Sequence, residues 1–195
     1  DGNFPTCPFP NPEIRQSFEC ALKMAEEIQP DLLLATDPDC DRVGIAVQDG
    51  NGGYKLMSGN EVGAMMLNYL LSQKAEKGTL SKQSVAVKSF VSTDLAEVIA
   101  KKHNCTFKNL LTGFKYIGEL ITQLEAEGRA DDFVMGFEES YGYLAGTHAR
   151  DKDAVVASML ICEMAAYYKS QGRSLAEVMD SLYDEFGYYF NVVES

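Results

Sequence analysis

The chain has 195 residues, of which 46% are hydrophobic, enough to bury the core of one large domain or of a domain and part of another. Its formal net charge of -12 argues against nucleic-acid binding, and any anionic ligand must be met by local cations. Five scattered cysteines without a Cys-x-x-Cys pair, and only two histidines, argue against a zinc site or a disulfide framework. They predict a reducing, cytoplasmic compartment, and no apolar run is long enough to indicate a membrane partner.

The first 57 residues predict turns, one helix and three strands. Asn11 and Pro12 are typical of the N-cap and first position of a helix that ends near Gln29. Apolar runs predict strands at 31–36 and 43–47, separated by an acidic stretch. The Asp-Gly-Asn-Gly-Gly run at 49–53 predicts a hinge or hairpin turn before a short strand at 54–57.

Strands then alternate with helices to the end of the chain. The predicted helices are one capped by Asn60, one at 93–102, one around 117–124, one ending near Ser170, and one opened by a capping box of Ser174 and Glu177. The predicted strands are 84–90, 106–110 and 133–135, and residues 74–82 are expected to form a polar loop. This alternation is typical of α/β layering.

The acidic stretch carries carboxylates at every second position, Asp37, Asp39 and Asp41. Pro38 removes a backbone donor and restricts the residue before it to extended geometry, so a tight loop rather than a helix is expected. Three carboxylates from such a loop can converge on one point, and oxygen ligands suit a hard cation such as Mg²⁺, held at roughly 2.0–2.1 Å. A solvated acidic turn is the alternative on residue types alone.

Arg42 bears on the choice between cations. A calcium loop of the EF-hand type needs a glycine and a terminal glutamate at fixed offsets, whereas Arg42 and Val43 follow here. A guanidinium beside three carboxylates hinders cation capture unless it also holds another anion, such as a phosphate. The stretch therefore favours magnesium with a phosphate ligand nearby over calcium.

Three further polar stretches are candidates for ligand contacts. Residues 138–140, Glu-Glu-Ser, follow an apolar strand, where α/β sheets usually bind ligands, and could exchange hydrogen bonds with sugar hydroxyls. Residues 112–115, Thr-Gly-Phe-Lys, could contact a ligand, but they equally well predict a threonine N-cap that opens a helix. Residues 150–153, Arg-Asp-Lys-Asp, are by themselves typical of a solvated face. A hydrophilic turn is the alternative for residues 138–140.

The Asp-Pro-Asp-Cys-Asp-Arg run at 37–42 resembles the metal-binding loop of the α-D-phosphohexomutases, the phosphoglucomutase and phosphomannomutase superfamily. Residues 112–115, 138–140 and 150–153 resemble later motifs of that family, and residues 1–5 and 10–13 resemble signatures that precede the metal loop. The motifs occur in the family's order and cover the chain from residue 1 to about residue 190.

The resemblance implies a role for each matching residue. The metal ligands for Mg²⁺ would be Asp37, Asp39 and Asp41. Positive charge beside the transferring phosphoryl group would come from the two catalytic residues, Arg42 and Lys152. The substrate-binding residues would be Asp41, Arg42, Thr112, Gly113, Glu138, Ser140 and Lys152, among which Glu138 and Ser140 would contact the hexose.

The resemblance also implies a fold and a domain organisation. Residues 51–195 would form the family's third domain, a three-layer α/β/α sandwich with a mostly parallel mixed sheet, and residues 1–50 the C-terminal part of a similar second domain. The family's phosphoserine loop, of Thr-Ala-Ser-His-Asn-Pro type, has no match, and its C-terminal phosphate-binding domain is absent. Because the chain also begins on Asp1 rather than Met, we expect a fragment whose partners are those two domains.

The implied reaction interconverts hexose 1-phosphate and hexose 6-phosphate. A phosphoserine gives its phosphoryl group to the hexose phosphate, and the hexose 1,6-bisphosphate, intermediate and activator, reorients and returns its other phosphoryl group. The fragment alone is predicted to turn over nothing. A hexose 1,6-bisphosphate synthase of the same family and a non-catalytic metal and sugar-phosphate binding module stay open, as do glucose, mannose and pentose phosphates. A phosphatase with Asp37 as nucleophile is disfavoured, because the match assigns Asp37 to the metal.

Overall fold

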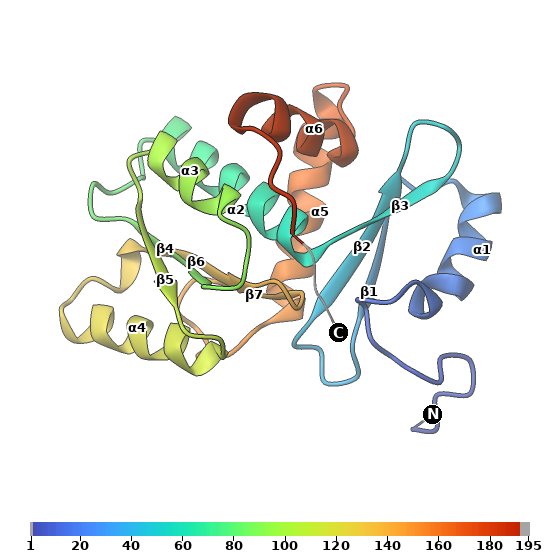
Figure 1. Ribbon diagram of the computed structural model, residues 1–195, viewed down its shortest axis with the longest axis horizontal. Helices are drawn as coiled ribbons and strands as arrows, with labels where there is room; N and C mark the ends of the chain where they lie inside the picture. The colour runs from blue at the N-terminus through green and yellow to red at the C-terminus, as the bar shows by residue number, and fades with distance from the viewer. Residues whose placement is uncertain (1, 192–195) are drawn as a thin grey trace.

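The computed structural model describes residues 2–191, which form two β-sheets with helices around them (Figure 1). Asp1 of the first motif and residues 192–195 of the expected third domain lie outside the described residues. The first sheet is antiparallel in the order β1-β2-β3, with β1 at Leu32–Thr36, β2 at Val43–Gln48 and β3 at Tyr54–Met57. Helix α1 (Glu19–Ile28), preceded by a 3-10 turn at Arg15–Phe18, lies beside this sheet.

The acidic stretch is the connection of the β1–β2 hairpin. Thr36 pairs with Val43, so residues 37–42, hereafter the acidic loop, join the two strands at one end of the sheet. Strand β2 is the central strand, and its residues 43–47 are all buried. A buried strand next to the acidic loop gives that loop a rigid base.

The second sheet has the order β5-β4-β6-β7, with β4 at Val85–Ser89, β5 at Thr106–Leu110, β6 at Phe133–Glu138 and β7 at Gly142–Ala145. Strands β5, β4 and β6 are parallel, and β7 is antiparallel to β6. Helix α4 (Phe114–Ala126) covers one face, and α2 (Gly59–Glu76) and α3 (Leu95–Lys102) cover the other (Figure 1). This mixed sheet between helices confirms the predicted α/β fold class.

Helix α5 (Ala154–Ser170) packs against strands of both sheets, and α6 (Leu175–Phe186) follows it. One hydrophobic core contains buried residues of β2, α2, α5 and α6, together with Ala86, Met135 and Phe137 of the second sheet. A smaller core between the sheet and α4 includes Val85, Val87 and Ile117. Adjacent residues of β4 thus alternate between the two cores, as the pleat of a strand requires. None of the helices in residues 2–191 combines the length and apolarity needed to cross a bilayer.

Two predicted helix starts were wrong. The side chain of Asn11 accepts a hydrogen bond from the backbone N–H of Glu13 at 2.9 Å, which forms a turn, and helical structure begins only at Arg15. Ser58, not Asn60, caps α2, because Ser58 and Glu61 form a reciprocal capping box. Asn60 instead accepts from the backbone N–H of Thr93 at 2.9 Å.

Further differences concern lengths and one strand. Helix α2 continues to Glu76, two residues beyond the start of the expected polar loop. Strand β7 was not predicted, because it exists through pairing with β6 rather than through a local pattern. Gly113, not Thr112, is the N-cap residue of α4, and no side chain caps this helix. The capping box of Ser174 and Glu177 is confirmed.

Candidate active site

The acidic loop gathers the three aspartates. One ligand oxygen from each of Asp37, Asp39 and Asp41 lies within 4.8 Å of the others. The backbone N–H of Cys40 donates to the carbonyl of Asp37 at 3.1 Å, and Cys40 has a φ of 59°, in the left-handed region. Alternate side chains lie on the same side of an extended strand as well, but this tight turn brings the three carboxylates closer together than a strand would.

Asp37 is the most constrained of the three. Its side chain is buried; Oδ1 accepts from the backbone N–H of Asp41 and of Arg42, each at 3.1 Å, and Oδ2 accepts from Nε of Arg42 at 2.7 Å. Burial raises the pKa of Asp37, but the hydrogen bonds from Arg42 outweigh that effect and the net pKa lies below its ordinary value. Asp37 is therefore a carboxylate at neutral pH.

Two cations flank the acidic loop. Arg42 bridges Asp37 and Glu13, with its Nη1 at 2.9 Å from Oε1 of Glu13. Nζ of Lys152 lies 3.0 Å from Asp41 and 2.9 Å from Asp151. Burial lowers the pKa of Lys152, but the Asp151 and Asp41 carboxylates outweigh it, so the net pKa is raised. Both cations stay charged at neutral pH.

The chemistry of the donor set fits a hard divalent cation. All three donors are carboxylate oxygens, the ligands that Mg²⁺ prefers. Asp39 is exposed, and its carboxylate has no hydrogen-bond or ion-pair partner within residues 2–191, so it is free to bind. Asp37 and Asp41 are each shared with a protein cation, which reduces the negative charge that a metal would meet.

The structure joins residues 112–115 to residues 138–140, hereafter the Glu-Glu-Ser loop. Glu138, at the end of β6, is buried, and its Oε1 accepts from the backbone N–H of Gly113 at 2.7 Å. Gly113 has a φ of 118°, which favours glycine. Thr112 is exposed beside it. Ser140 lines a cavity of about 560 Å³, whose other lining residues include Glu13, Ser58, Gly59, Val91 and Glu139.

Backbone contacts connect the acidic loop to the Glu-Glu-Ser loop. Val43 N–H donates to the carbonyl of Tyr141 at 3.1 Å, and Arg42 forms an isolated antiparallel bridge with Gly142. Ala154 N–H, at the start of α5, donates to the carbonyl of Cys40 at 3.1 Å. The aliphatic stem of Lys152 packs so closely on Gly142 that a Cβ there would lie 2.2 Å from Cδ of the lysine.

Not every residue of the polar stretches joins this convergence. Arg150 forms an ion pair with Glu125 on α4, and Nζ of Lys115 lies over the Tyr116 ring, 5.0 Å from its centroid. Nε2 of His148 lies 2.8 Å from Oδ2 of Asp153, the N-cap residue of α5. Of the 150–153 stretch, Lys152 is the residue that contacts the acidic loop.

Sequence reasoning missed two charged residues near these loops. Glu13, the partner of Arg42, belongs to the Pro-Asn-Pro-Glu motif, but no role was assigned to it. Lys88 is 1% exposed at the end of β4, where its Nζ lies 3.1 Å from Asp94 and 2.9 Å from the carbonyl of Ser92. A lysine that ends the apolar run Val-Ala-Val was the available signal for Lys88.

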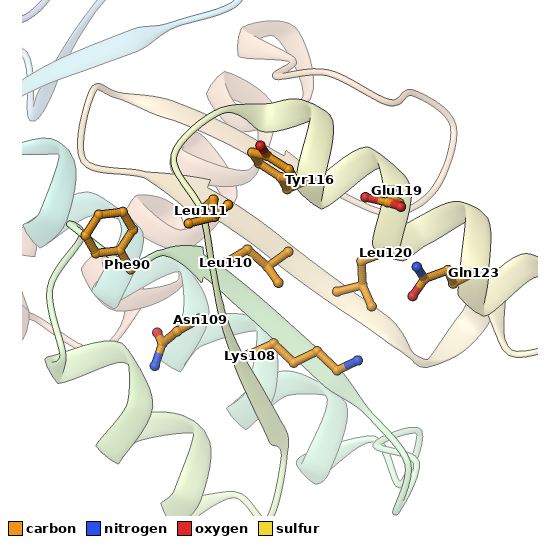
Figure 2. Close-up of a pocket in the computed structure, with 9 residues that line it drawn as sticks. All are labelled: Phe90, Lys108, Asn109, Leu110, Leu111, Tyr116, Glu119, Leu120 and Gln123. Atoms are coloured by element: carbon orange, nitrogen blue, oxygen red, sulfur yellow. The ribbon is translucent and has the colours of Figure 1, made fainter.

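A separate pocket of about 400 Å³ lies between α4 and the edge strand β5 (Figure 2). Leu110 and Leu120 face each other across it, with Lys108 and Glu119 at its borders. None of the predicted site residues lines this pocket, so it is distinct from the convergence around the acidic loop.

Comparison with known proteins places the chain in a family. Residues 58–186 match the family described as phosphoglucomutase/phosphomannomutase, alpha/beta/alpha domain III, and residues 1–52 match its domain II. The chain belongs to the phosphoglucomutase/phosphomannomutase family, as the resemblance predicted. A phosphoglucomutase of Staphylococcus haemolyticus is 36% identical over 189 residues, which cover 97% of this chain and 33% of the relative. A phosphoglucomutase of Staphylococcus aureus is 36% identical over 187 residues, again 33% of its length.

Solved structures share the fold. A phosphoglucomutase/phosphomannomutase family protein from Burkholderia thailandensis has a TM-score of 0.68 at 13% identity, covering 93% of this chain and 35% of that chain. The N-acetylphosphoglucosamine mutase of Aspergillus fumigatus, solved with GlcNAc-6P and magnesium, has a TM-score of 0.56 at 15% identity, covering 87% and 37%. The chain thus spans about a third of the length of its relatives.

Proposed function

We propose that this chain supplies the metal-binding and sugar-binding parts of a phosphohexomutase that interconverts hexose 1-phosphate and hexose 6-phosphate. In this proposal residues 1–50 end the second domain and residues 51–195 form the third, with the phosphoserine and the second phosphate site supplied by other domains. The observation that carries the proposal is convergence: Lys152 bonds to Asp41 while its stem packs on Gly142, two residues after the Glu-Glu-Ser loop. Metal, phosphoryl and sugar contacts would then meet in one place.

The acidic loop would hold Mg²⁺ through Asp37, Asp39 and Asp41. When bound, the ion would neutralise charge on the transferring phosphoryl group. Arg42 and Lys152 would add fixed positive charge near that group, in positions that their ion pairs with Asp37 and Asp41 already set. The Aspergillus mutase was solved with magnesium and GlcNAc-6P, and we extend both ligand classes to this chain as part of the proposal.

The Glu-Glu-Ser loop would bind the hexose. Oε1 of Glu138 is occupied by the Gly113 N–H, whereas Oε2 has no hydrogen-bond partner within residues 2–191 and is available for a sugar hydroxyl. Ser140, on the wall of the neighbouring cavity, would donate or accept a second hydrogen bond. Thr112 and Gly113 would then help to recognise the orientation of the sugar. Gly113 would do so indirectly, because its N–H holds the carboxylate of Glu138.

Metal titration of the chain tests the first half of the proposal. We expect weak Mg²⁺ binding by calorimetry, and at least about tenfold weaker binding in Asp39→Asn, a loss of about 1.4 kcal/mol. The matched control is Asp131→Asn, an exposed aspartate in the short turn before β6. Equal affinity in all three proteins would contradict the magnesium site.

Sugar-phosphate titration tests the second half. Glucose 1-phosphate or mannose 1-phosphate should shift the amide resonances of residues 112–113 and 138–140, and the preferred sugar would name the substrate. Shifts confined to the pocket between β5 and α4 would contradict the proposed site. A coupled mutase assay of this chain should show no turnover, and measurable turnover would refute the assignment of the nucleophile to another domain.

A further inference from the structure

Glu139 stands between the two proposed hexose contacts, yet its carboxylate is engaged elsewhere. Its Oε2 accepts from the hydroxyls of Ser89 at 2.9 Å and Ser92 at 3.0 Å. The backbone N–H of Glu139 donates back to Oγ of Ser92 at 2.9 Å. Both serines are buried, at 1% and 4% exposed, so these hydrogen bonds are shielded from water.

The turn that carries the two serines is itself fixed. Nζ of buried Lys88 donates to the carbonyl of Ser92 at 2.9 Å, and Lys88 pairs with Asp94 at 3.1 Å. Thr93 N–H donates to the side chain of Asn60 on α2 at 2.9 Å. The turn after β4 is thus tied to its own strand and to α2, so the partner of Glu139 is itself held by several polar contacts.

The backbone of Glu139 also lies against the start of α2. A Cβ on Gly59, in the first turn of α2, would lie 2.1 Å from the carbonyl oxygen of Glu139. The hydroxyl of Tyr143, after the loop, donates to the carbonyl of Gly59 at 3.2 Å. The backbone at Glu139 is therefore held between α2 and the turn after β4.

We propose that Glu139, Ser89 and Ser92 form a latch that positions Glu138 and Ser140, so that Glu139 is a positioning residue rather than a sugar contact. Because Glu139 lies between them in the chain, fixing both its N–H and its carboxylate fixes the directions of the neighbouring side chains. The sugar-binding consequence rests on the proposed function, whereas the positioning of Glu138 does not. The latch gives the two adjacent glutamates separate tasks.

The amide of Gly113 reports on the latch without any ligand, because its N–H donates to Glu138. In Glu139→Ala and Ser92→Ala we expect its hydrogen exchange to quicken about tenfold, the effect of losing about one hydrogen bond to a charged group. Glu139→Gln keeps an acceptor oxygen and should restore slow exchange. Glu119→Gln, an exposed change on α4, is the control.

Unchanged Gly113 exchange in folded Glu139→Ala would overturn the latch. The latch would also be overturned if amide hydrogen exchange quickened uniformly across the second sheet in Ser92→Ala, Glu139→Ala and Glu139→Gln alike. That result would indicate a general loss of stability. Ser92→Ala guards against a Glu139→Ala variant that does not fold.

Binding measurements on the same proteins connect the latch to the ligand. Ser92→Ala should bind glucose 1-phosphate about tenfold more weakly than the original chain, with unchanged Mg²⁺ affinity, because within residues 2–191 no hydrogen bond or ion pair joins the acidic loop to the serines. If the original chain binds no sugar phosphate, the proposed function fails, and Gly113 exchange still decides the latch. If it binds and Ser92→Ala binds equally well, the latch does not position the sugar contacts.

Discussion

Nζ of Lys152 lies 3.0 Å from Oδ2 of Asp41, so one proposed metal ligand is already paired with a cation of the protein. The pair is partly shielded, with the lysine side chain 17% and the aspartate side chain 28% exposed. Lysine and a bound metal would therefore compete for the same carboxylate, while the same lysine would attract a phosphoryl group. The competition predicts the direction in which Mg²⁺ affinity changes when the lysine charge is removed.

Replacing Lys152 with methionine should strengthen metal binding and weaken sugar-phosphate binding. Removal of a neighbouring unit charge near a wet surface corresponds to about 1 kcal/mol, or about fivefold in Mg²⁺ affinity. Calorimetric titration of Lys152→Met with Mg²⁺ and with glucose 1-phosphate gives both affinities. The control is Lys115→Met, because the ammonium group of Lys115 lies over the Tyr116 ring. Weaker metal binding in Lys152→Met alone would show that the lysine organises the acidic loop rather than competing with the ion.

Asp153 should make the stability of α5 depend on pH. Its Oδ1 accepts from the N–H groups of Val155 at 2.9 Å and Val156 at 3.0 Å, and its Oδ2 faces His148. Burial raises the pKa of Asp153, but these hydrogen bonds and His148 outweigh it, so the net pKa is lowered. A lowered folded-state pKa adds stability that is full above the unfolded value of about 3.9 and is lost as the pH falls through the folded value.

The corresponding test compares Asp153→Asn and Asp153→Ala by urea unfolding. Asparagine keeps the cap and should cost about 0.5 kcal/mol at pH 7, whereas alanine should cost about 1 kcal/mol because the cap is lost. The cost of Asp153→Asn should shrink below about pH 4, as the pH falls from the unfolded-state pKa of the original carboxylate toward its lowered folded-state pKa. A cost that is constant from pH 7 to pH 3 would contradict the charge contribution.

Gly63 should tolerate no side chain. A Cβ there would lie 2.4 Å from Cδ2 of Phe137, a fully buried ring near the end of β6. Gly63→Ala should cost about 1–3 kcal/mol, because overpacking outweighs the better helix propensity of alanine. Each kcal/mol should lower the melting temperature by about 2–4 °C. Ser72→Ala on the same helix should stay within about 0.5 kcal/mol, and a Gly63→Ala protein of equal stability would show that Phe137 can move.

Cys40 carries the backbone strain of the acidic loop. With a φ of 59°, glycine would relieve the strain, although it would also lose some packing against the core. Cys40→Gly should therefore change stability by less than about 1 kcal/mol, whereas β-branched Cys40→Val should cost about 1–2 kcal/mol. Cys40→Val should also weaken Mg²⁺ binding. Equal melting temperatures and metal affinities for the two variants would contradict a left-handed residue 40.

Local patterns predicted the elements that local interactions form. Strands β1 and β2 and the Ser174 cap follow from apolar runs or from side chains within one turn, whereas the mostly parallel pairing of the second sheet was implied by the resemblance. Ser58 and Glu61 have the same three-residue spacing as Ser174 and Glu177, so this capping box was also predictable, but the prediction placed the cap at Asn60. Strand β7 has no such local signal, because its partner β6 defines it.

The candidate site shows the same division. Residue patterns and the resemblance indicated the acidic loop and the Glu-Glu-Ser loop, but neither indicated how the two loops meet. The partner of Arg42 is Glu13, 29 residues earlier, and Ser92 meets Glu139 from 47 residues away. Contacts over such separations depend on how the sheets and turns fold together, and a single sequence does not reveal them.

Gly142, the first residue of β7, does not have a left-handed backbone, so an alanine could adopt its conformation. Space is what disfavours a side chain, since a Cβ at Gly142 would lie 2.2 Å from Cδ of Lys152, so the lysine stem would have to move. In a saturation scan, every replacement at position 142 would thus displace the ammonium group of a residue ten positions away. A change of size alone at position 142 would then alter ligand affinity through the position of that charge.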